Sequence, residues 1–264
     1  MEQWHYDSAV DLDAALIERL RILRRRPNIV VSSIRMLSAI VVRAWLRAYH
    51  RIEISGRDNL PLDRSFVLIA NHASHLDTLC LLAALPIRRV NDAFPVAAND
   101  YFCANRFRAF IANIFVNAMP FDRLFAPWES LSACAHLLNE PNTILVYFPE
   151  GTRLGNCQPG EFTPGVAMLV AGRDIPVVPC HIAGAHSALP KGAWIPRPRS
   201  LQLNIGAPRM YRHLSPTKEC AKEISRDLRE AVISLGQDSR STMPSKQMDS
   251  SGIGRSVLVK SEAL

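Results

Sequence analysis

The sequence predicts an α/β fold, with a mixed, largely parallel sheet flanked by helices. Short apolar runs rich in β-branched residues alternate along the 264-residue chain with segments of helical periodicity. Two of these runs, residues 66–70 and 143–148, end directly in polar sequence that carries histidine, carboxylate and arginine side chains. Open α/β sheets hold their chemistry just beyond the carboxyl ends of their strands, so we expect an active site at these two exits.

Charge divides the chain into three expected segments. Nine arginines and no acidic residue lie between Arg19 and Arg51, whereas the rest of the chain is close to neutral. Such a block predicts an anionic partner, either a membrane leaflet or a nucleic acid. We expect membrane-associating helices over 1–49, an α/β domain over 50–236, and a serine-rich disordered tail over 237–264.

Two helices are predicted in the basic segment, over residues 8–26 and 30–48. In the second, an apolar stripe recurs at steps of three or four, and Arg35, Arg43 and Arg47 lie off that stripe. This pattern fits a helix in a membrane interface with its arginines at the phosphate level, or an ordinary helix packed on the domain. Nucleic-acid binding is the weaker alternative, because the sequence shows no recognisable nucleic-acid-binding fold.

Neither a signal peptide nor a conventional membrane-spanning helix is expected. The first residues are polar and acidic, and no window offers 18 uninterrupted apolar residues. The six cysteines are scattered without a C-x-x-C pair, which predicts a reducing compartment and buried, structural thiols.

The remaining elements are bounded by proline and glycine. Pro86 ends one expected helix, Pro127 begins another, and Gly236 is expected to stop the last. Strands are predicted over 51–55, 66–70, 94–98, 143–148, 175–182 and 201–205, and helices over 76–85, 127–139, 166–171 and 216–235.

The first motif holds His72 and Asp77, five positions apart. On a regular helix they would point about 140° away from each other. If His72 instead lies in the loop after the strand and Asp77 in the first helical turn, the carboxylate can fold back and orient the imidazole as a general base. Asp77 could also cap the helix with Ser74, and His72, His75 and Asp77 could be metal ligands, as in a metallohydrolase.

The second motif, Phe148 to Arg153, combines a tight strand exit with an acid and a guanidinium. Pro149 and Gly151 bend the chain and expose Glu150, backbone amides and Arg153, which suit a phosphate or a developing oxyanion. Arg123, after its own apolar run, is a further candidate anion ligand.

Four blocks in this order resemble the glycerolipid acyltransferase family, over roughly residues 50–210. They are Asn71-His72 with Asp77, the segment ending in Arg123, the Phe148 to Arg153 motif, and the apolar run 175–179. Two positions depart from the family pattern: Ala118 stands where glycine is common, and Thr163 follows Phe162 where lysine is common.

The resemblance implies transfer of a fatty acyl group from acyl-CoA or acyl carrier protein to 1-acylglycerol-3-phosphate, giving phosphatidic acid. It implies His72 as general base, Asp77 as its orienting partner, no metal, and no cofactor beyond the acyl donor. Other acceptors, such as glycerol phosphate or a phosphorus-free lyso-lipid, and a non-catalytic membrane-binding protein are the alternatives. A bilayer acceptor favours attachment to the anionic cytoplasmic leaflet of the cell membrane over nucleic acid. The implied substrate-binding residues are Arg123, Glu150, Gly151, Thr152 and Arg153, and those on the acyl-donor side are Ile175, Pro176 and Val177.

Overall fold

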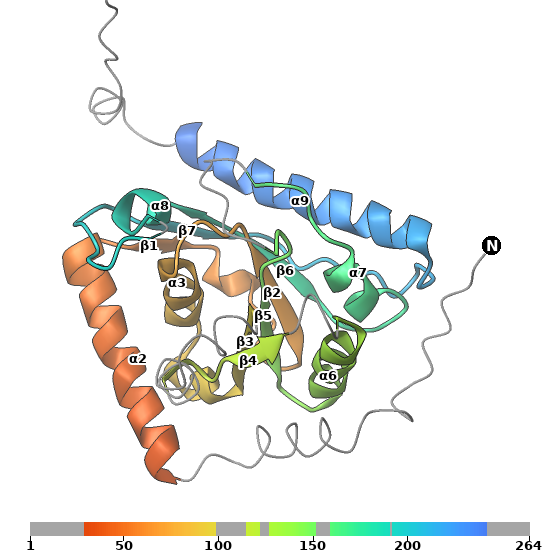
Figure 1. The fold of residues 1–264 in the computed structure, drawn as a ribbon, viewed down its shortest axis with the longest axis horizontal. Helices are drawn as coiled ribbons and strands as arrows, with labels where there is room; N and C mark the ends of the chain where they lie inside the picture. Colours follow the sequence, from red (N-terminus) through yellow and green to blue (C-terminus); the bar gives the residue numbers. More distant parts are fainter. Residues whose placement is uncertain (1–28, 99–114, 122–126, 152–158, 191, 242–264) are drawn as a thin grey trace, which may run out of the picture.

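A single sheet forms the centre of the computed structural model, which describes residues 29–98, 115–121, 127–151, 159–190 and 192–241 (Figure 1). Within these ranges the sheet has seven strands in the order β1-β7-β6-β2-β5-β3-β4. The strands are β1 (Glu53–Ser55), β2 (Phe66–Ala70), β3 (Ala93–Ala98), β4 (Met119–Phe121), β5 (Ile144–Tyr147), β6 (Val177–Ala183) and β7 (Gln202–Ile205). The α-helices are α2 (Ile29–His50), α3 (Leu76–Ala84), α6 (Pro127–Asn139), α7 (Gly165–Val170), α8 (Ala185–Ala188) and α9 (Lys218–Ser241), with 3₁₀ turns η1 (Arg57–Asn59) and η2 (Ile87–Asp92).

The predicted mixed, largely parallel sheet is confirmed. Strand β2 lies between β5 and β6 and is parallel to both, and of the described ladders only β6 with β7 is antiparallel. From β2 the chain passes outward to β3 and returns to β5, and it then crosses to β6 on the other side of β2. The strand order therefore reverses around β2, which is where α/β folds bind their ligands.

Alternate residues of the central strand feed two separate cores. Val67 and Ile69 pack into a cluster with residues of α6, α7 and α9, whereas Phe66 and Leu68 pack into a second cluster with residues of α2 and α3. Both faces of a parallel sheet are covered in this way, which explains why β2 reads as a continuous apolar run. The result is a sheet between two helical layers (Figure 1).

Two arginines of helix α2 face the domain, which differs from the sequence expectation for them. Arg35 is only 3% exposed and its guanidinium donates to the side chain of Asn91, while Arg43 donates to the carbonyl oxygens of Leu82 and Leu85 at the end of α3. These two arginines therefore bind the domain, and the prediction that they lie at the lipid phosphates is wrong. Unpaired carbonyls at a helix C-terminus attract a cation, which gives the inward position a physical reason.

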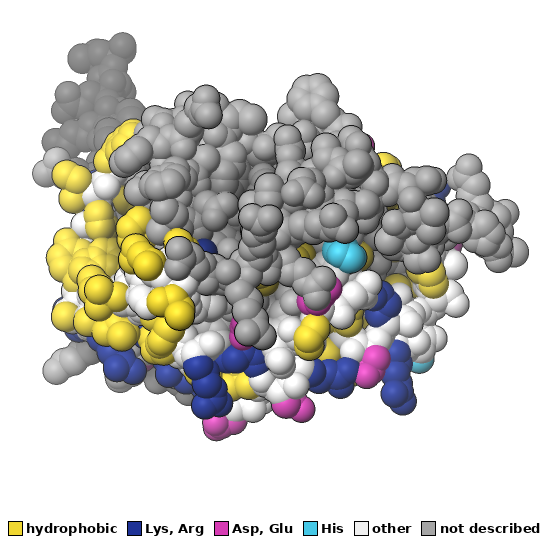
Figure 2. All heavy atoms as spheres, turned by 90° about the horizontal axis from the view of Figure 1, so that it is seen from below, with side chains coloured by type: hydrophobic (Ala, Val, Ile, Leu, Met, Phe, Trp, Pro, Cys, Tyr) yellow, Lys and Arg dark blue, Asp and Glu magenta, His cyan; other side chains and the backbone are white. Residues whose placement is uncertain are grey.

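The apolar side chains of α2 point outward instead. Its large exposed side chains form one continuous face, which is the apolar patch seen over α2 in Figure 2. By length and composition alone this helix could also cross a membrane, so the described residues include one candidate span that the search for uninterrupted apolar runs did not indicate. The exposed apolar residues are Ile29, Val30, Ile34, Leu37, Ile40 and Val41.

The last helix runs past its predicted stop. Gly236 lies inside α9, and a Cβ atom built on it would come within 2.6 Å of the Nε2 atom of His181 on β6. This glycine allows the helix to approach the sheet and does not end it. The first five residues of the expected tail, 237–241, continue α9, and the rest lies outside the described residues, as does the helix expected over 8–26.

Candidate functional site

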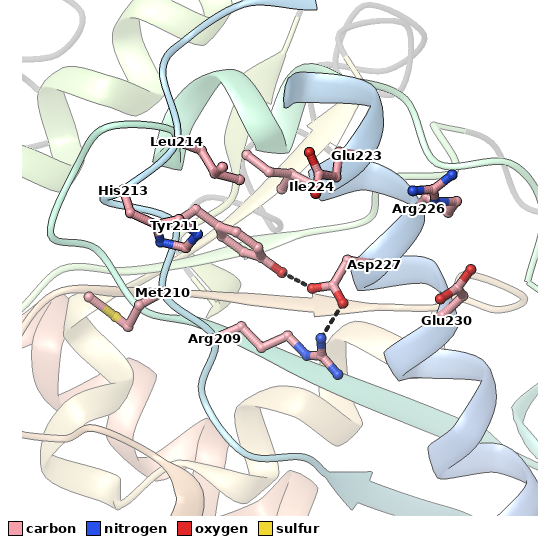
Figure 3. Close-up of a pocket in the computed structure, with 10 residues that line it drawn as sticks. All are labelled: Arg209, Met210, Tyr211, His213, Leu214, Glu223, Ile224, Arg226, Asp227 and Glu230. Atoms are coloured by element: carbon pink, nitrogen blue, oxygen red, sulfur yellow. Dashed lines mark hydrogen bonds and ion pairs between the residues drawn. The ribbon is translucent and has the colours of Figure 1, made fainter. Parts of the chain in front are cut away.

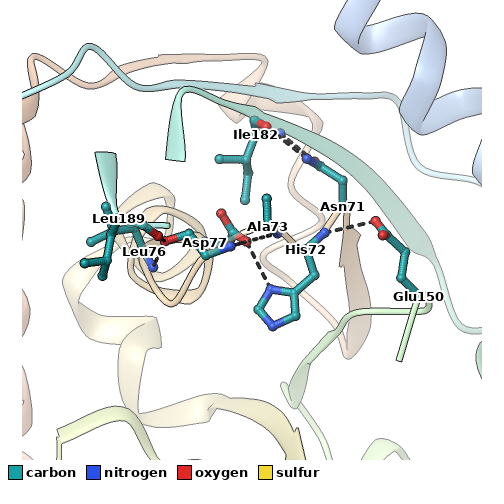
Figure 4. A network of polar contacts seen from close by, with 9 residues as sticks. Asn71, His72, Ala73, Leu76, Asp77, Glu150, Ile182 and Leu189 are labelled. Carbon is teal, nitrogen blue, oxygen red and sulfur yellow. Dashed lines mark hydrogen bonds and ion pairs between the residues drawn. The ribbon is translucent and has the colours of Figure 1, made fainter. Parts of the chain in front are cut away.

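His72 and Asp77 meet at the carboxyl end of β2. His72 lies in the loop after the strand, Asp77 is the second residue of α3, and the imidazole Nδ1 is 3.0 Å from the carboxylate Oδ2 (Figure 4). Asp77 is completely buried, whereas the His72 side chain is 20% exposed. The loop-to-helix turn thus joins two residues that a regular helix would separate.

Asp77 also caps the start of α3. Its Oδ2 atom accepts hydrogen bonds from the backbone amides of Ala73 at 2.7 Å and Ser74 at 2.8 Å, in addition to the imidazole contact. The capping interpretation and the imidazole contact are therefore both present in one carboxylate. Because Oδ2 is an acceptor for two N–H groups, the contacting Nδ1 must be the protonated ring nitrogen, and Nε2 is left with its lone pair.

Glu150 fixes the backbone of the histidine. Its Oε1 atom accepts a hydrogen bond from the His72 amide at 3.0 Å, and its carboxylate also accepts from the Gly160 amide. Burial raises the pKa of Glu150 above its ordinary value, although both amide hydrogen bonds act in the opposite direction. This buried acid supports the loop that carries the imidazole.

Two residues of the motifs to which the sequence analysis assigned no site role complete the support. The Phe148 ring stacks on the His72 ring with centroids 4.1 Å apart, and the Asn71 side chain donates to the Ile182 carbonyl and accepts from the Ile182 amide. Asn71 thereby extends the pairing of β2 with β6 into the loop. Its place directly before His72, at the end of a buried strand, is the sequence signal that could have indicated this role.

The exit from β5 is a tight turn that Thr163 holds in place. The Gly151 amide donates to the Phe148 carbonyl at 3.1 Å, and Gly151 adopts a φ of 68°, which favours glycine. Thr163 donates both its amide and its hydroxyl to the Pro149 carbonyl, each at 2.9 Å. The threonine that departs from the family pattern therefore has a structural function in this turn.

The structure brings only some of the predicted site residues together. His72, Asp77, Glu150 and Gly151 lie around the ends of β2 and β5. The predictions for Arg123, Thr152 and Arg153 lie outside the described residues.

Ile175, Pro176 and Val177 do not reach this edge of the sheet. Val177 pairs in parallel with Val67 at the beginning of β2, and it is fully buried in the core. At 3.3 Å per strand residue, it lies about 16 Å from the His72 end of the sheet. The structure therefore places this run at the opposite end of β2 from His72, and its assignment to the acyl-donor side stays a prediction.

His72, His75 and Asp77 do not form a metal-ligand group. His75 is exposed at the start of α3, and among the residues that the structure describes no cluster of three or more histidine, cysteine or carboxylate side chains could hold a metal ion. The metal-ligand interpretation of the first motif is therefore not supported by its geometry.

The cysteines that the structure describes match the structural interpretation. Cys80, Cys134 and Cys180 are buried free thiols, and burial raises the pKa of each, that of Cys134 to about 12. Such thiols are poor nucleophiles because the thiolate is the reactive form. Cys220 is partly exposed, and Cys103 and Cys157 lie outside the described residues.

A separate pocket of about 440 Å³ lies between α9 and the segment that follows β7 (Figure 3). Within it, Asp227 accepts a hydrogen bond from the Tyr211 hydroxyl at 2.5 Å and forms an ion pair with Arg209. Burial, followed by the neighbouring carboxylate, raises the pKa of Tyr211. These three groups satisfy one another and connect α9 to the segment after β7. None of the predicted site residues that the structure describes lines this pocket.

Comparison with known proteins gives a consistent result. A 1-acyl-sn-glycerol-3-phosphate acyltransferase of Chlamydomonas reinhardtii is 28% identical over 193 residues, which cover 70% of this chain and 53% of that protein. The human 1-acyl-sn-glycerol-3-phosphate acyltransferase alpha is 29% identical over 131 residues, covering 49% of this chain and 44% of the human protein. The chain thus spans about half the length of the curated relatives it matches.

The fold has a counterpart among solved structures. The crystal structure of the 1-acyl-sn-glycerophosphate acyltransferase PlsC from Thermotoga maritima superposes with a TM-score of 0.64 at 23% identity, covering 88% of this chain and 89% of that one. The acyltransferase family itself matches residues 51–183, which is half of the chain and includes His72, Asp77 and Glu150. With that match, the chain belongs to the acyltransferase family.

Proposed function

We propose that this protein transfers a fatty acyl group from acyl-CoA or acyl carrier protein to the free hydroxyl of 1-acylglycerol-3-phosphate, giving phosphatidic acid. The observation that carries the proposal is the His72 imidazole, whose Nδ1 contacts the buried Asp77 carboxylate while its ring remains partly exposed. The names of the relatives support the acceptor class. The acyl donor is a co-substrate, and the mechanism uses no further cofactor.

In the proposed reaction, His72 is the general base. Its Nε2 atom takes the proton of the acceptor hydroxyl as the oxygen attacks the thioester carbonyl carbon. The charge of Asp77 stabilises the imidazolium that forms. When the tetrahedral intermediate collapses, the carbon–sulfur bond breaks and the imidazolium proton passes to the leaving thiolate. The products are the new oxygen ester and free thiol, and the histidine returns to its neutral form.

Glu150 supports this chemistry through the backbone. Its carboxylate accepts a hydrogen bond from the His72 amide and so fixes the backbone of the loop, whereas the Asp77 carboxylate contacts the His72 ring. Stacking on Phe148 restricts ring rotation further. We therefore assign Glu150 a positioning role in the acceptor site, together with the turn at Gly151.

Recognition of the acceptor phosphate is proposed for Arg123, Thr152 and Arg153 on the family resemblance. Guanidinium groups bind phosphate through paired hydrogen bonds, and a lysine cannot reproduce this fork geometry. Replacing either arginine should raise KM for a phosphate-bearing acceptor more than it lowers kcat.

Membrane association is proposed through α2. Its six large exposed apolar side chains form a face on the outside of the fold, and such a face needs a partner. A lipid surface is the partner that also holds the acceptor, and the exposed arginines Arg47 and Arg51 at its C-terminal end favour the anionic cytoplasmic leaflet. Arg35 and Arg43 have no part in lipid binding because they bind the domain.

The test is acyl transfer by the full chain in detergent micelles, with labelled acyl-CoA and a panel of lyso-lipid acceptors. His72→Ala should lower kcat about 10²- to 10⁴-fold, the contribution of a positioned general base, with unchanged unfolding. His75→Ala is the matched control, because that histidine is exposed at the start of α3 and its replacement should keep the activity. Turnover retained by His72→Ala, or preference for a phosphate-free acceptor, would contradict the mechanism or the acceptor assignment respectively.

A further inference from the structure

An exposed apolar pair lies on the proline-rich arm formed by residues 192–200. Trp194 is 80% exposed and Ile195 is 81% exposed, and they are neighbours in a segment without regular secondary structure. A tryptophan and an isoleucine held side by side in water are unfavourable unless a partner covers them. Tryptophan in particular concentrates at membrane–water interfaces, where its ring is buried and its N–H stays hydrated.

Hydrogen bonds hold this arm against the C-terminal end of α2. The Tyr49 hydroxyl donates to the Pro196 carbonyl at 2.9 Å, and the Leu201 amide at the base of the arm donates to the His50 carbonyl at 3.1 Å. Within the arm, the Arg197 amide donates to the Ala188 carbonyl of α8. The arm that carries the exposed pair is therefore fixed at the C-terminal end of α2, the helix that also carries the outward apolar face.

The surroundings of the pair are basic. Arg197 and Arg199 are exposed on the arm, and Arg47 and Arg51 are exposed at the neighbouring end of α2. No acidic residue occurs in the sequence of either segment, 44–52 or 186–201. An apolar tip with arginines around it complements an anionic bilayer, whose phosphates lie just above the acyl chains.

The base of the arm touches the catalytic loop. The Ser74 hydroxyl donates to the Leu189 carbonyl at 2.8 Å, and Ser74 is also the residue whose amide binds Asp77. The segment that would meet lipid is thus connected by one hydrogen bond to the loop between His72 and α3.

We propose that the arm is a second lipid-contact site, in which Trp194 and Ile195 insert into the interface of an anionic membrane beside α2. This inference rests on the membrane association proposed above for α2 and extends it to a segment about 150 residues later in the sequence. The hydrogen bond between Ser74 and Leu189 would then link this lipid contact to the loop that carries His72.

The direct test is the fluorescence of Trp194 in the full chain with Trp4, Trp45 and Trp128 replaced by Phe. On addition of phosphatidylcholine–phosphatidylglycerol vesicles, the emission should shift to the blue and be quenched by brominated lipids. The matched control keeps only Trp128, which lies on α6 across the molecule from α2, and its emission should stay unquenched (Figure 1). Unchanged Trp194 emission in a chain that co-sediments with the vesicles would overturn the inference.

A second test measures partition between water and the same vesicles across a lipid titration. Trp194→Ser with Ile195→Ser should weaken partition about 10-fold or more, whereas Trp128→Ser should leave it unchanged. The double variant should also raise KM for an acceptor presented in vesicles, with kcat in micelles retained. Partition and KM equal to those of the wild type would refute the contact.

These outcomes separate the two proposals. A chain that binds vesicles and shows Trp194 quenching but transfers no acyl group would refute the function and keep the lipid contact. Acyl transfer in micelles without any vesicle binding would refute both lipid contacts and keep the catalytic assignment.

Discussion

Replacing Asp77 by Asn is the most informative single change in the site, because this one carboxylate both caps α3 and contacts the base. Its Oδ2 atom accepts from the His72 ring and from two backbone amides, whereas its Oδ1 atom is buried without a hydrogen-bond partner among the described residues. In Asp77→Asn the amide oxygen can take the Oδ2 position and keep all three contacts. The ring and its tautomer are then retained, and only the negative charge is lost.

The magnitude follows from that geometry. A hydrogen bond to a charged group contributes about 1.5–3 kcal/mol and a neutral one about 1 kcal/mol, so the imidazolium loses about 0.5–2 kcal/mol of stabilisation. This corresponds to a decrease in kcat of about 2- to 30-fold, far less than expected for His72→Ala. Asp77→Ala, in contrast, leaves the buried amides of Ala73 and Ser74 without an acceptor, which should reduce the free energy of unfolding by about 2–6 kcal/mol.

The assay pairs initial rates of thiol release from acyl-CoA with urea unfolding of the same preparations. We expect Asp77→Asn to be moderately slow and folded, and Asp77→Ala to be unstable. An Asp77→Asn enzyme that folds like the wild type and is as inactive as His72→Ala would refute the reasoning. Wild-type kcat in Asp77→Asn would show that the carboxylate is only a helix cap.

Three further predictions concern groups outside that pair. Burial raises the pKa of Glu150, so its contribution to stability is complete below its ordinary pKa of about 4.5 and is lost as pH rises through the folded value. The free energy of unfolding of the wild type minus that of Glu150→Gln should therefore fall as pH rises over that range. A difference that does not depend on pH would contradict this. Gly236→Ala should lower the free energy of unfolding by about 1–3 kcal/mol through the contact with His181, measurable by urea titration. Tyr211→Phe should lower it by about 1.5–3 kcal/mol, since the Asp227 hydrogen bond is charge-assisted, without changing kcat.

Local pattern was sufficient for the central strands and for the first motif. Strand β2 and helix α6 have the bounds that their apolar runs and flanking residues predict, because burial on both faces leaves a continuous signal. The five-residue spacing of His72 and Asp77 also indicated a loop-to-helix turn correctly, because a regular helix could not join them.

Long-range partners account for what the sequence could not predict. The partners of Arg43 come about 40 residues later, so its periodicity alone could not show which side of α2 faces the domain. The register of β6 against β2 places Val177 beside Val67, at the end of β2 that is far from His72. Strand β4, which lies at the edge of the sheet and has only three residues, was not predicted because so short a run carries little periodic signal.

The inward arginines of α2 have a consequence for the geometry of the proposed membrane-bound state. With Arg35 bonded to Asn91 and Arg43 to the end of α3, the helix cannot turn about its own axis without breaking contacts at two points more than two helical turns apart. A helix bound to lipid through its apolar face would then hold the whole domain in one orientation. The height and tilt of the His72 site above the bilayer plane are then properties of the folded protein, set before any lipid is bound.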